Sequence, residues 1–425
     1  MKYFFILGKT PVLSIAEITS LFARDQVEFE LVECSAEVLI VETKKELDAD
    51  YLMAQLGGTV KLGIVHANKY ANTNELNANT IVGEFLEDTG KKTFFGFSFY
   101  ELAEGISPRR FTEKVKGLGM AVKEQLKEAG RSARLVVMKE GNALSSVVVK
   151  KNKLLTQGAE IVIFLSQQGI YLGRTERVQE FEEYGFRDFG RPSRDIISGT
   201  MPPKLAKMMI NLAGIGFEKI LLDPFCGSGT ILGEAGLMGY ENVVGSDSSE
   251  KAIKDTETNI QWLFKNFRSK ISLSAEASAK AEDFKLLNKD IKELKKEIAP
   301  NSIDAIVTEP YLGPPQKSNA GRGEMERVAK DLSKLYLETF RVFGNILKPK
   351  ARAVVIFPAF HPQGEEWVIY LPIIKEILAM GFSLINPLPE AVRNHPEIRM
   401  TERGSIIFSR PDQRVLREIF VWEKK

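Results

Sequence analysis

Residues 219–250 read KILLDPFCGSGTILGEAGLMGYENVVGSDSSE. The apolar run from Ile220 to Leu222 is typical of a buried parallel strand, and the glycine-containing turn after it ends the strand. Gly227 and Gly229 permit a positive φ and a close approach of the backbone to a ligand. A helix pattern and a second short strand follow, and that strand delivers Asp247 to the same end of the sheet. The segment therefore predicts a β-α-β unit with a ligand at the carboxyl ends of its strands.

The spacing of the glycines distinguishes between nucleotide ligands. A dinucleotide fingerprint, G-x-G-x-x-G, needs a glycine where this chain has Leu232, and the Gly-Lys-Ser/Thr of a P-loop is absent. One acid precedes the glycines and Asp247 follows the next strand. Carboxylates suit a ligand with ribose hydroxyls and a positive charge better than one with phosphates. A lone glycine pair is usually only a turn, but the whole block with its spaced acid favours S-adenosylmethionine as the cofactor.

Length and composition restrict the remaining possibilities. The 425 residues have room for about three domains, and 44% hydrophobic residues are typical of a folded soluble protein. A net charge of +2 is too small to predict nucleic-acid binding from the total. Cys34 and Cys226 are far apart and the three histidines are scattered, so we expect neither a disulfide framework nor a metal site. No apolar stretch approaches the roughly 20 residues that span a bilayer, and we expect a cytoplasmic protein without a membrane partner.

The first 67 residues have the pattern of a small α/β unit. Strand patterns at 3–7, 29–32, 38–41 and 60–65 alternate with helix patterns at 13–22 and 51–56. The order β-α-β-β-α-β is that of a ferredoxin-like module. We assign residues 1–67 to such a module.

Residues 68–178 form a second predicted unit. An aromatic strand at 93–99 precedes a helix that begins after Pro108 and has one apolar stripe. Lysines on its polar face and basic residues downstream can meet RNA phosphates, although interleaved glutamates also fit an ordinary solvated face. The predicted RNA-binding residues of this unit are Lys123, Lys127, Arg131, Arg134 and Lys151.

The polar residues 179–199 are predicted to form a linker. Arg187 and Arg191 can pair with nearby Asp188 and Asp195, or can contact the RNA backbone on its way to the active site. We count both arginines among the candidate RNA-binding residues.

Residues 200–425 alternate helix and strand patterns, which predicts a doubly wound α/β sheet with a solvated insertion at 268–282. Two later strands also end in acids, Asp290 and Glu309, so the acids and the glycine turn are expected to line one crevice. Asp247 is placed to accept from ribose hydroxyls and Asp290 from the adenine amine. The predicted cofactor-binding residues are Asp223, Phe225, Gly227, Gly229, Thr230, Asp247, Ser248 and Asp290.

The candidate catalytic residues are Glu309, Pro310 and Tyr311. A base amine is a poor nucleophile because its lone pair is delocalised into the ring, so a transferase must orient it and accept its hydrogens. Glu309, held rigid by Pro310, can do this, and Tyr311 offers a face on which a flipped base can stack. The tripeptide alone also fits a strand-ending turn. Its place at a strand tip of the cofactor sheet favours the catalytic role.

Together these features resemble a known family, the THUMP-domain tRNA guanosine N2-methyltransferases that modify position 10 of tRNA. The resemblance covers nearly the whole chain. Its strongest blocks are Arg187-Asp188, Arg191-Pro192, residues 203–213 and residues 222–230, and the THUMP signature is matched at 144–146, 152–154 and 158–160. The resemblance implies a ferredoxin-like module at 1–67, a THUMP RNA-binding domain at 68–178 and a Rossmann-like methyltransferase domain at 200–425. It also implies that the first two parts hold the tRNA by its acceptor end while a guanine is flipped out.

One tetrapeptide departs from the family pattern. The family has Asp/Asn-Pro-Pro-Tyr/Phe, whereas this chain has Glu309-Pro310-Tyr311-Leu312. The acid is one methylene longer, and a displacement of about 1 Å can cost on the order of 100-fold in rate. The downstream Pro314-Pro315 can supply the missing rigidity.

We therefore predict an S-adenosylmethionine-dependent methyltransferase acting on the N2 amine of a tRNA guanosine. Two alternatives remain open at this point: an N6-adenine methyltransferase of RNA or DNA, and an inactive RNA-binding protein with a methyltransferase fold. The expected partner is tRNA and the expected state is a monomer. The sequence leaves open whether a small activating subunit is required.

Overall fold

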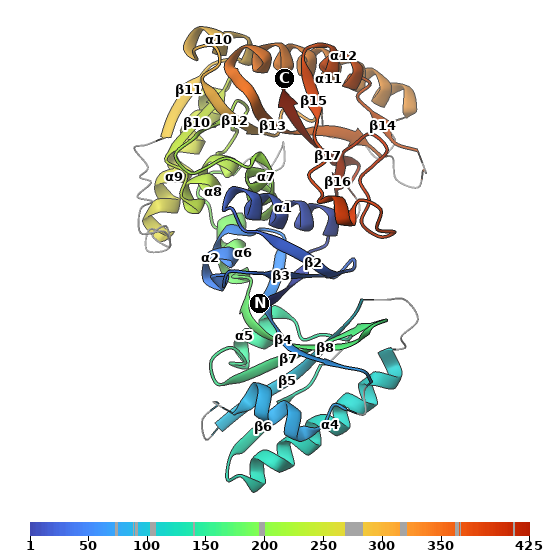
Figure 1. Cartoon of the computed structure of the whole chain (residues 1–425). Coiled ribbons are helices and arrows are strands. Elements are labelled where there is room, and N and C mark those ends of the chain that lie inside the picture. Colours follow the sequence, from blue (N-terminus) through green and yellow to red (C-terminus); the bar gives the residue numbers. More distant parts are fainter. Residues whose placement is uncertain are drawn as a thin grey trace.

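The computed structural model describes residues 1–425 except 73–74, 88, 90–91, 103–107, 139–140, 195–199, 268–283, 315–320, 362–364, 366 and 411–412. The predicted insertion at 268–282 thus lies outside the described residues, as does Asp195. The described strands form two sheets of eight and nine strands (Figure 1). The first sheet belongs to the N-terminal half of the chain and the second to the C-terminal half. No helix in the described ranges is both long and apolar enough to cross a bilayer.

The element order predicted for the first 67 residues is confirmed. The elements are β1 (Lys2–Leu7), α1 (Pro11–Arg24), β2 (Phe29–Cys34), β3 (Val38–Thr43), α2 (Ala49–Gln55) and β4 (Thr59–Tyr70). The four strands pair antiparallel in the spatial order β2-β3-β1-β4.

The same sheet continues through the second predicted unit. Its elements are α3 (Ala78–Ile81), η1 (Val82–Leu86), β5 (Lys92–Glu101), α4 (Pro108–Glu128), β6 (Ser132–Val136), α5 (Ser146–Lys151), β7 (Gly158–Ser166) and β8 (Gly169–Val178). β4 pairs with β1 on one edge and with β8 on the other. The full strand order of the sheet is therefore β2-β3-β1-β4-β8-β7-β5-β6. The predicted boundary after residue 67 therefore falls inside β4. The assignment of 68–178 to a THUMP domain stays a prediction.

A buried ion pair joins the strands of this sheet. Lys61 of β4 pairs with Glu160 of β7, and both side chains are buried. Glu160 also accepts from the hydroxyls of Ser98 and Thr175, at 2.5 and 2.7 Å, and Lys61 donates to the carbonyl oxygen of Leu144 at 2.6 Å. Four strands and the loop before α5 thus share one polar network. Such a network stabilises the fold only while all its members are present.

Replacing Lys61 by methionine should lower the free energy of unfolding by about 3–5 kcal/mol, because it leaves the Glu160 carboxylate buried without its counter-charge. Denaturant unfolding measures the change. The matched control is Lys69→Met, because Lys69 is an exposed lysine on the same strand. Equal losses in the two variants would contradict a special role for the buried pair.

Helix α1 attaches the N-terminal module to the second half of the chain. Its sequence predicts an amphipathic helix, yet all ten residues from Leu13 to Phe22 are buried. One face packs on the sheet of β1–β4, and α7 (Pro203–Ala213) covers the other (Figure 1). The apolar core is therefore continuous from the first module into the C-terminal half.

The loop at residues 54–58, which includes the last two residues of α2, is held by side chains from both sides of this contact. Buried Glu17 accepts from the amides of Gly57 and Gly58, at 2.7 and 2.8 Å, and from the side-chain amide of Asn211 at 2.9 Å. Asn211 also donates to the carbonyl oxygen of Gln55 at 3.0 Å. The backbone of this loop is thus hydrogen-bonded across the contact.

The second sheet is doubly wound, as predicted. Its elements are β9 (Ile220–Asp223), α8 (Thr230–Met238), β10 (Asn242–Asp247), α9 (Glu250–Phe267), β11 (Phe284–Asn288), η4 (Ile291–Glu293), α10 (Leu294–Glu297), β12 (Ile303–Thr308), α11 (Arg322–Ile346), β13 (Leu347–Phe360), β14 (Ile369–Tyr370), α12 (Ile374–Ala379), β15 (Phe382–Leu384), η5 (Glu390–Val392), β16 (Ile406–Phe408) and β17 (Val415–Lys424). The order is β11-β10-β9-β12-β13-β17-β15, parallel from β11 to β13 and antiparallel from there to β15. This confirms the predicted Rossmann-like fold.

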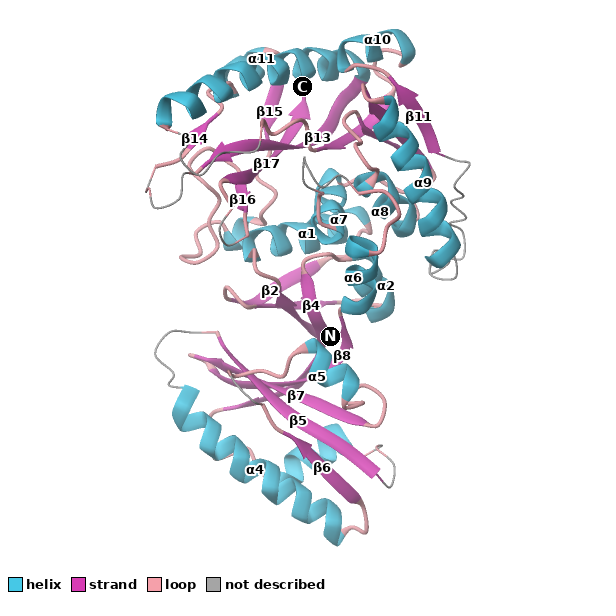
Figure 2. Cartoon of the chain, turned by 180° about the vertical axis from the view of Figure 1, so that it is seen from behind, coloured by secondary structure: helices cyan, strands magenta, loops and turns pink. Residues whose placement is uncertain are grey.

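Helices cover both faces of this sheet (Figure 2). Neighbouring residues of β9 enter different cores: Leu221 packs with α7, α8 and α9, and Leu222 with α10, α11 and α12. Burial on both faces explains why the strand reads as a continuous apolar run.

Candidate active site

The glycine turn after β9 is fixed on one side and open on the other. Gly227 and Gly229 have φ of +52° and +82°. A Cβ on Gly229 would lie 2.8 Å from Cγ2 of Thr256 in α9, whereas one on Gly227 would meet nothing within 4 Å. Thr256 donates to the carbonyl oxygen of Gly227 at 2.7 Å, and the Gly227 amide donates to Asp247 at 3.1 Å. The turn is therefore held by β10 and α9 and leaves space beside Gly227 that a ligand can fill.

The turn lies where the direction of strand addition reverses. From β9 the chain proceeds to β10 and β11 on one side, and then to β12 on the other side of β9. The carboxyl ends of β9 and β12 thus flank the crevice in which open α/β sheets bind ligands.

Asp223 supports this crevice from within. It is 1% exposed and accepts from the Thr308 hydroxyl at 2.7 Å and from the Phe225 amide at 3.2 Å. Burial, together with the nearby charges of Asp247 and Glu309, raises the pKa of Asp223 from 3.8 to about 7. Asp223, Asp247 and Glu309 therefore lie close enough for their charges to interact. Asp223 itself is a buried brace between β9 and β12, and its role in cofactor binding stays a prediction.

The other predicted cofactor residues differ in their surroundings. Asp247 is half-buried and also accepts from the Ser249 amide at 2.9 Å, while Ser248 beside it is exposed. Asp290 is exposed and caps a short 3-10 helix by accepting from the Lys292 amide at 3.0 Å. Asp247 therefore stabilises the turn through hydrogen bonds to backbone amides, whereas the side chains of Ser248 and Asp290 are exposed to solvent.

The predicted catalytic acid has a partner that the sequence did not reveal. At the end of β12, the carboxylate of Glu309 accepts from both Nε and Nη2 of Arg417, at 2.5 and 3.3 Å. Arg417 lies on β17 and is buried. The two residues are 108 positions apart, and no motif marks Arg417, so only the antiparallel pairing of β17 with β13 brings them together.

The rest of this strand tip combines a buried proline with an exposed aromatic ring. Pro310 is buried and Tyr311 is 51% exposed. The Tyr336 hydroxyl of α11 donates to the carbonyl oxygens of Ile356 and Tyr311, at 3.1 and 3.5 Å. The backbone of the tip is thus braced while the Tyr311 ring remains available for stacking.

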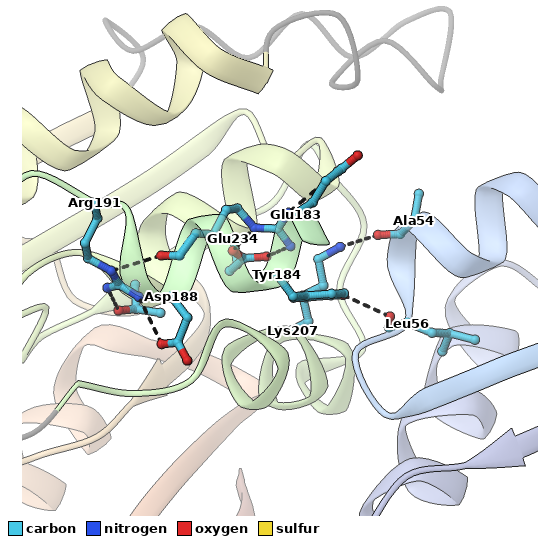
Figure 3. Close-up of polar contacts among 10 residues, drawn as sticks. Ala54, Leu56, Glu183, Tyr184, Asp188, Arg191, Lys207 and Glu234 are labelled. Atoms are coloured by element: carbon cyan, nitrogen blue, oxygen red, sulfur yellow. Dashed lines mark hydrogen bonds and ion pairs between the residues drawn. The ribbon is translucent and has the colours of Figure 1, made fainter. Parts of the chain in front are cut away.

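The predicted linker contains a packed helix, which corrects the assignment of 179–199. Helix α6 (Phe181–Phe189) lies against α7 and α8 (Figure 3). Arg187 is 6% exposed and donates to both carboxylate oxygens of Glu234 in α8, at 2.7 and 3.2 Å. Arg191 is also buried and donates to the Thr230 hydroxyl at 2.6 Å (Figure 3).

These contacts correct three predicted roles. Arg187 and Arg191 hold α6 on α8 and are too deeply buried to bind RNA phosphates. The Thr230 hydroxyl is directed to Arg191 and not to a cofactor. Arg187 pairs with Glu234, which lies 47 positions away and is not marked by any motif, instead of with nearby Asp188.

Most of the predicted RNA surface of the N-terminal half is exposed. Lys123, Lys127, Arg134 and Lys151 are exposed, and α4 lies at the end of the molecule away from the second sheet (Figure 1). Arg131 differs, because its guanidinium donates to the carbonyl oxygen of Leu86 at 2.6 Å and to the Thr93 hydroxyl at 3.0 Å. The role predicted for Arg131 is corrected to a local structural one.

Substituting Asp223 by asparagine should flatten the dependence of stability on pH. The folded protein keeps the Asp223 proton between about pH 4 and pH 7, where the unfolded chain has lost it, so this residue makes stability fall as the pH rises through that range. Melting temperatures at pH 5, 6, 7 and 8 should fall less in Asp223→Asn than in the wild type. Parallel curves would show that Asp223 is ionised throughout.

Comparisons with known proteins agree with the observed fold. Residues 191–361 match the UPF0020 family, described as an RMKL-like methyltransferase domain. This match confirms the predicted methyltransferase domain and supports S-adenosylmethionine as its cofactor. TrmN from Thermus thermophilus has a solved structure with a TM-score of 0.55 and 15% identity, covering 100% of both chains. That similarity concerns the fold alone.

Three curated relatives share the name tRNA (guanine(10)-N2)-dimethyltransferase. The one from Methanothermobacter thermautotrophicus is 37% identical over 115 residues, which is 27% of this chain and 28% of the relative. The one from Methanocaldococcus jannaschii is 36% identical over 134 residues, 32% and 34% of the two chains. Most of the length of these two relatives is therefore unmatched. A probable enzyme of this name from Methanothermococcus thermolithotrophicus is 31% identical over 129 residues, 30% of this chain and 70% of the relative. The chain therefore belongs to the family whose members are named tRNA (guanine(10)-N2)-dimethyltransferases.

Proposed function

We propose that this protein transfers a methyl group from S-adenosylmethionine to the exocyclic N2 amine of a tRNA guanosine, at position 10. The observation that carries the proposal is the pair of neighbouring strand tips. One tip has the open glycine turn at Gly227, and the other has the Glu309 carboxylate beside the exposed ring of Tyr311. The names of the relatives supply the base and the position.

The residues around the turn fit the proposed cofactor. The space beside Gly227 admits the ligand against the backbone, and Asp247, Ser248 and Asp290 offer acceptors for its hydroxyl and amine groups. The cluster of carboxylates also favours a positively charged ligand. When bound, the cofactor supplies an electrophilic methyl group.

Glu309 and Tyr311 would act on the target base. Tyr311 stacks with the flipped guanine, and Glu309 accepts a hydrogen bond from the N2 amine, which turns the nitrogen lone pair toward the methyl donor. Each carboxylate oxygen has two lone pairs, so both oxygens can accept from Arg417 and still accept from the amine. Arg417 thereby compensates for the missing second proline, because it fixes the longer acid from the side.

Incubation of the protein with S-adenosylmethionine and tRNA, followed by nucleoside mass spectrometry, tests the proposal. We expect N2-methylated guanosine from the wild type. Glu309→Gln should reduce kcat by about 100-fold or more, because it replaces the charged acceptor. Calorimetry should show nearly unchanged cofactor binding in that variant. Arg417→Met should also lower kcat, and Arg417→Lys should lower it less, whereas the exposed control Arg399→Met should match the wild type.

Other products would replace the proposal with a specific alternative. N6-methyladenosine would identify an adenine methyltransferase, since the same crevice accepts any exocyclic amine. No product, together with tRNA binding and no cofactor binding, would identify an RNA-binding protein that has lost its activity.

The basic face of α4 generates a separate prediction about tRNA. Reversing Lys123 and Lys127 to glutamate should weaken tRNA binding and reduce the slope of log Kd against log salt concentration, because phosphate contacts release counterions. Titrations at several salt concentrations measure both. The control Lys375→Glu changes an exposed lysine on α12. Unchanged affinity for tRNA in the double variant would show that the lysines of α4 lie on an ordinary solvated helix face.

A further inference from the structure

The segment after α6 is fastened to the glycine turn. Asn259 of α9 accepts from the Ser193 amide at 3.0 Å and donates to the Ser193 carbonyl oxygen at 2.8 Å. The same side-chain amide donates to the carbonyl oxygen of Ser228 at 2.9 Å, within the turn itself. The Asn259 side chain thus links Ser193 to the glycine turn of the candidate active site.

An exposed aromatic ring lies at the end of α6, just before this segment. Phe189 is 67% exposed, the highest value among the large apolar side chains that the structure describes. Phe186, one turn earlier, packs instead against Trp262 of α9, with ring centroids 5.1 Å apart. Phe189 thus presents its ring to the solvent, whereas Phe186 packs within the chain.

A guanidinium accompanies the ring. Arg194 is exposed, its Cζ lies 5.4 Å from the centroid of Phe189, and its Nη1 donates to the Phe189 carbonyl oxygen at 3.3 Å. Arg187 and Arg191 are buried and neutralised by internal partners, so Arg194 differs from them in facing the solvent. An aromatic face beside a cation suits a nucleobase and its phosphate, since stacking and charge act together on single-stranded nucleic acid.

We propose that Phe189 and Arg194 form a stacking platform for an RNA nucleotide next to the target base. The inference rests on the proposed function, in which RNA enters the crevice. Its location supports RNA over a protein partner, because Ser193, next to Arg194, is linked through Asn259 to the glycine turn of the proposed methyltransferase site. The basic face of α4 lies at the other end of the molecule (Figure 1). RNA bound at α4 therefore needs further contacts near the crevice that position the target nucleotide. Tyr311 then receives the target base on the β12 side and Phe189 a neighbouring base on the β9 side.

The platform is tested by measuring the binding of tRNA to the 425-residue protein by fluorescence anisotropy. Phe189→Ala should raise the Kd for tRNA by about tenfold, in line with the loss of one stacked base. Phe189→Tyr should restore wild-type affinity, because it keeps the aromatic face. Arg194→Gln should weaken binding and lower the salt slope by about one, whereas Phe189→Ala should leave that slope unchanged.

Matched controls separate the platform from general effects on the surface. Leu378→Ala removes an exposed apolar side chain from α12, and Lys375→Gln removes an exposed charge from the same helix. Both should bind tRNA like the wild type. All variants should bind S-adenosylmethionine normally by calorimetry and keep the wild-type melting temperature.

The wild type tests the proposed methyltransferase function, and the Phe189 and Arg194 variants test the platform. A wild type that neither binds nor methylates tRNA would overturn the proposed function and the platform with it. A wild type that methylates tRNA, with Phe189→Ala and Arg194→Gln unchanged in Kd and KM, would overturn the platform alone.

Discussion

The attachment of the loop at residues 54–58 to the methyltransferase domain is the contact on which the arrangement of the molecule depends. Asn211 of α7 and Tyr184 of α6 donate to the carbonyl oxygens of Gln55 and Leu56. Glu17 of α1 accepts from the amides of the two glycines that follow and also from Asn211, which joins both sides of the contact. Each backbone group would cost about 1–3 kcal/mol if it were left buried and unpaired. Separating the two halves would also expose the second apolar face of α1. The first module therefore belongs structurally to the catalytic half as much as to its own sheet.

This contact and the continuous first sheet have a joint consequence for substrate binding. β4 pairs with strands of both N-terminal units, so the basic face of α4 is connected to the crevice through ordered structure. A bound RNA would then contact the basic face of α4 and the crevice at a distance that the protein fold determines. Helix α6 contributes to the same arrangement, because Arg187 within it and Arg191 just after it fasten it to α8 beside the glycine turn (Figure 3).

Local patterns were sufficient for most of the secondary structure and for the centre of the site. The alternation of strands and helices predicted both halves of the fold, and the spacing from Gly227 to Asp247 identified the turn and the acid that holds it. Errors occurred where burial depends on distant partners. Residues 179–199 are polar and rich in turn residues, which predicts a linker, but within them α6 packs on α8, where Glu234 neutralises the buried Arg187. The charge of an arginine says nothing about whether it faces RNA or a buried carboxylate.

The sequence by itself determined the glycine turn, the doubly wound sheet and the presence of an acid at the tip of β12, because strand periodicity and glycine conformation act over a few neighbouring residues. Only the tertiary structure decided what surrounds them. It turned Asp223 inward, placed Arg417 on Glu309 from a strand 108 residues away, and left Phe189 exposed to the solvent. Those relations follow from strand order and helix packing, which bring together residues whose positions in the sequence bear no fixed relation to each other.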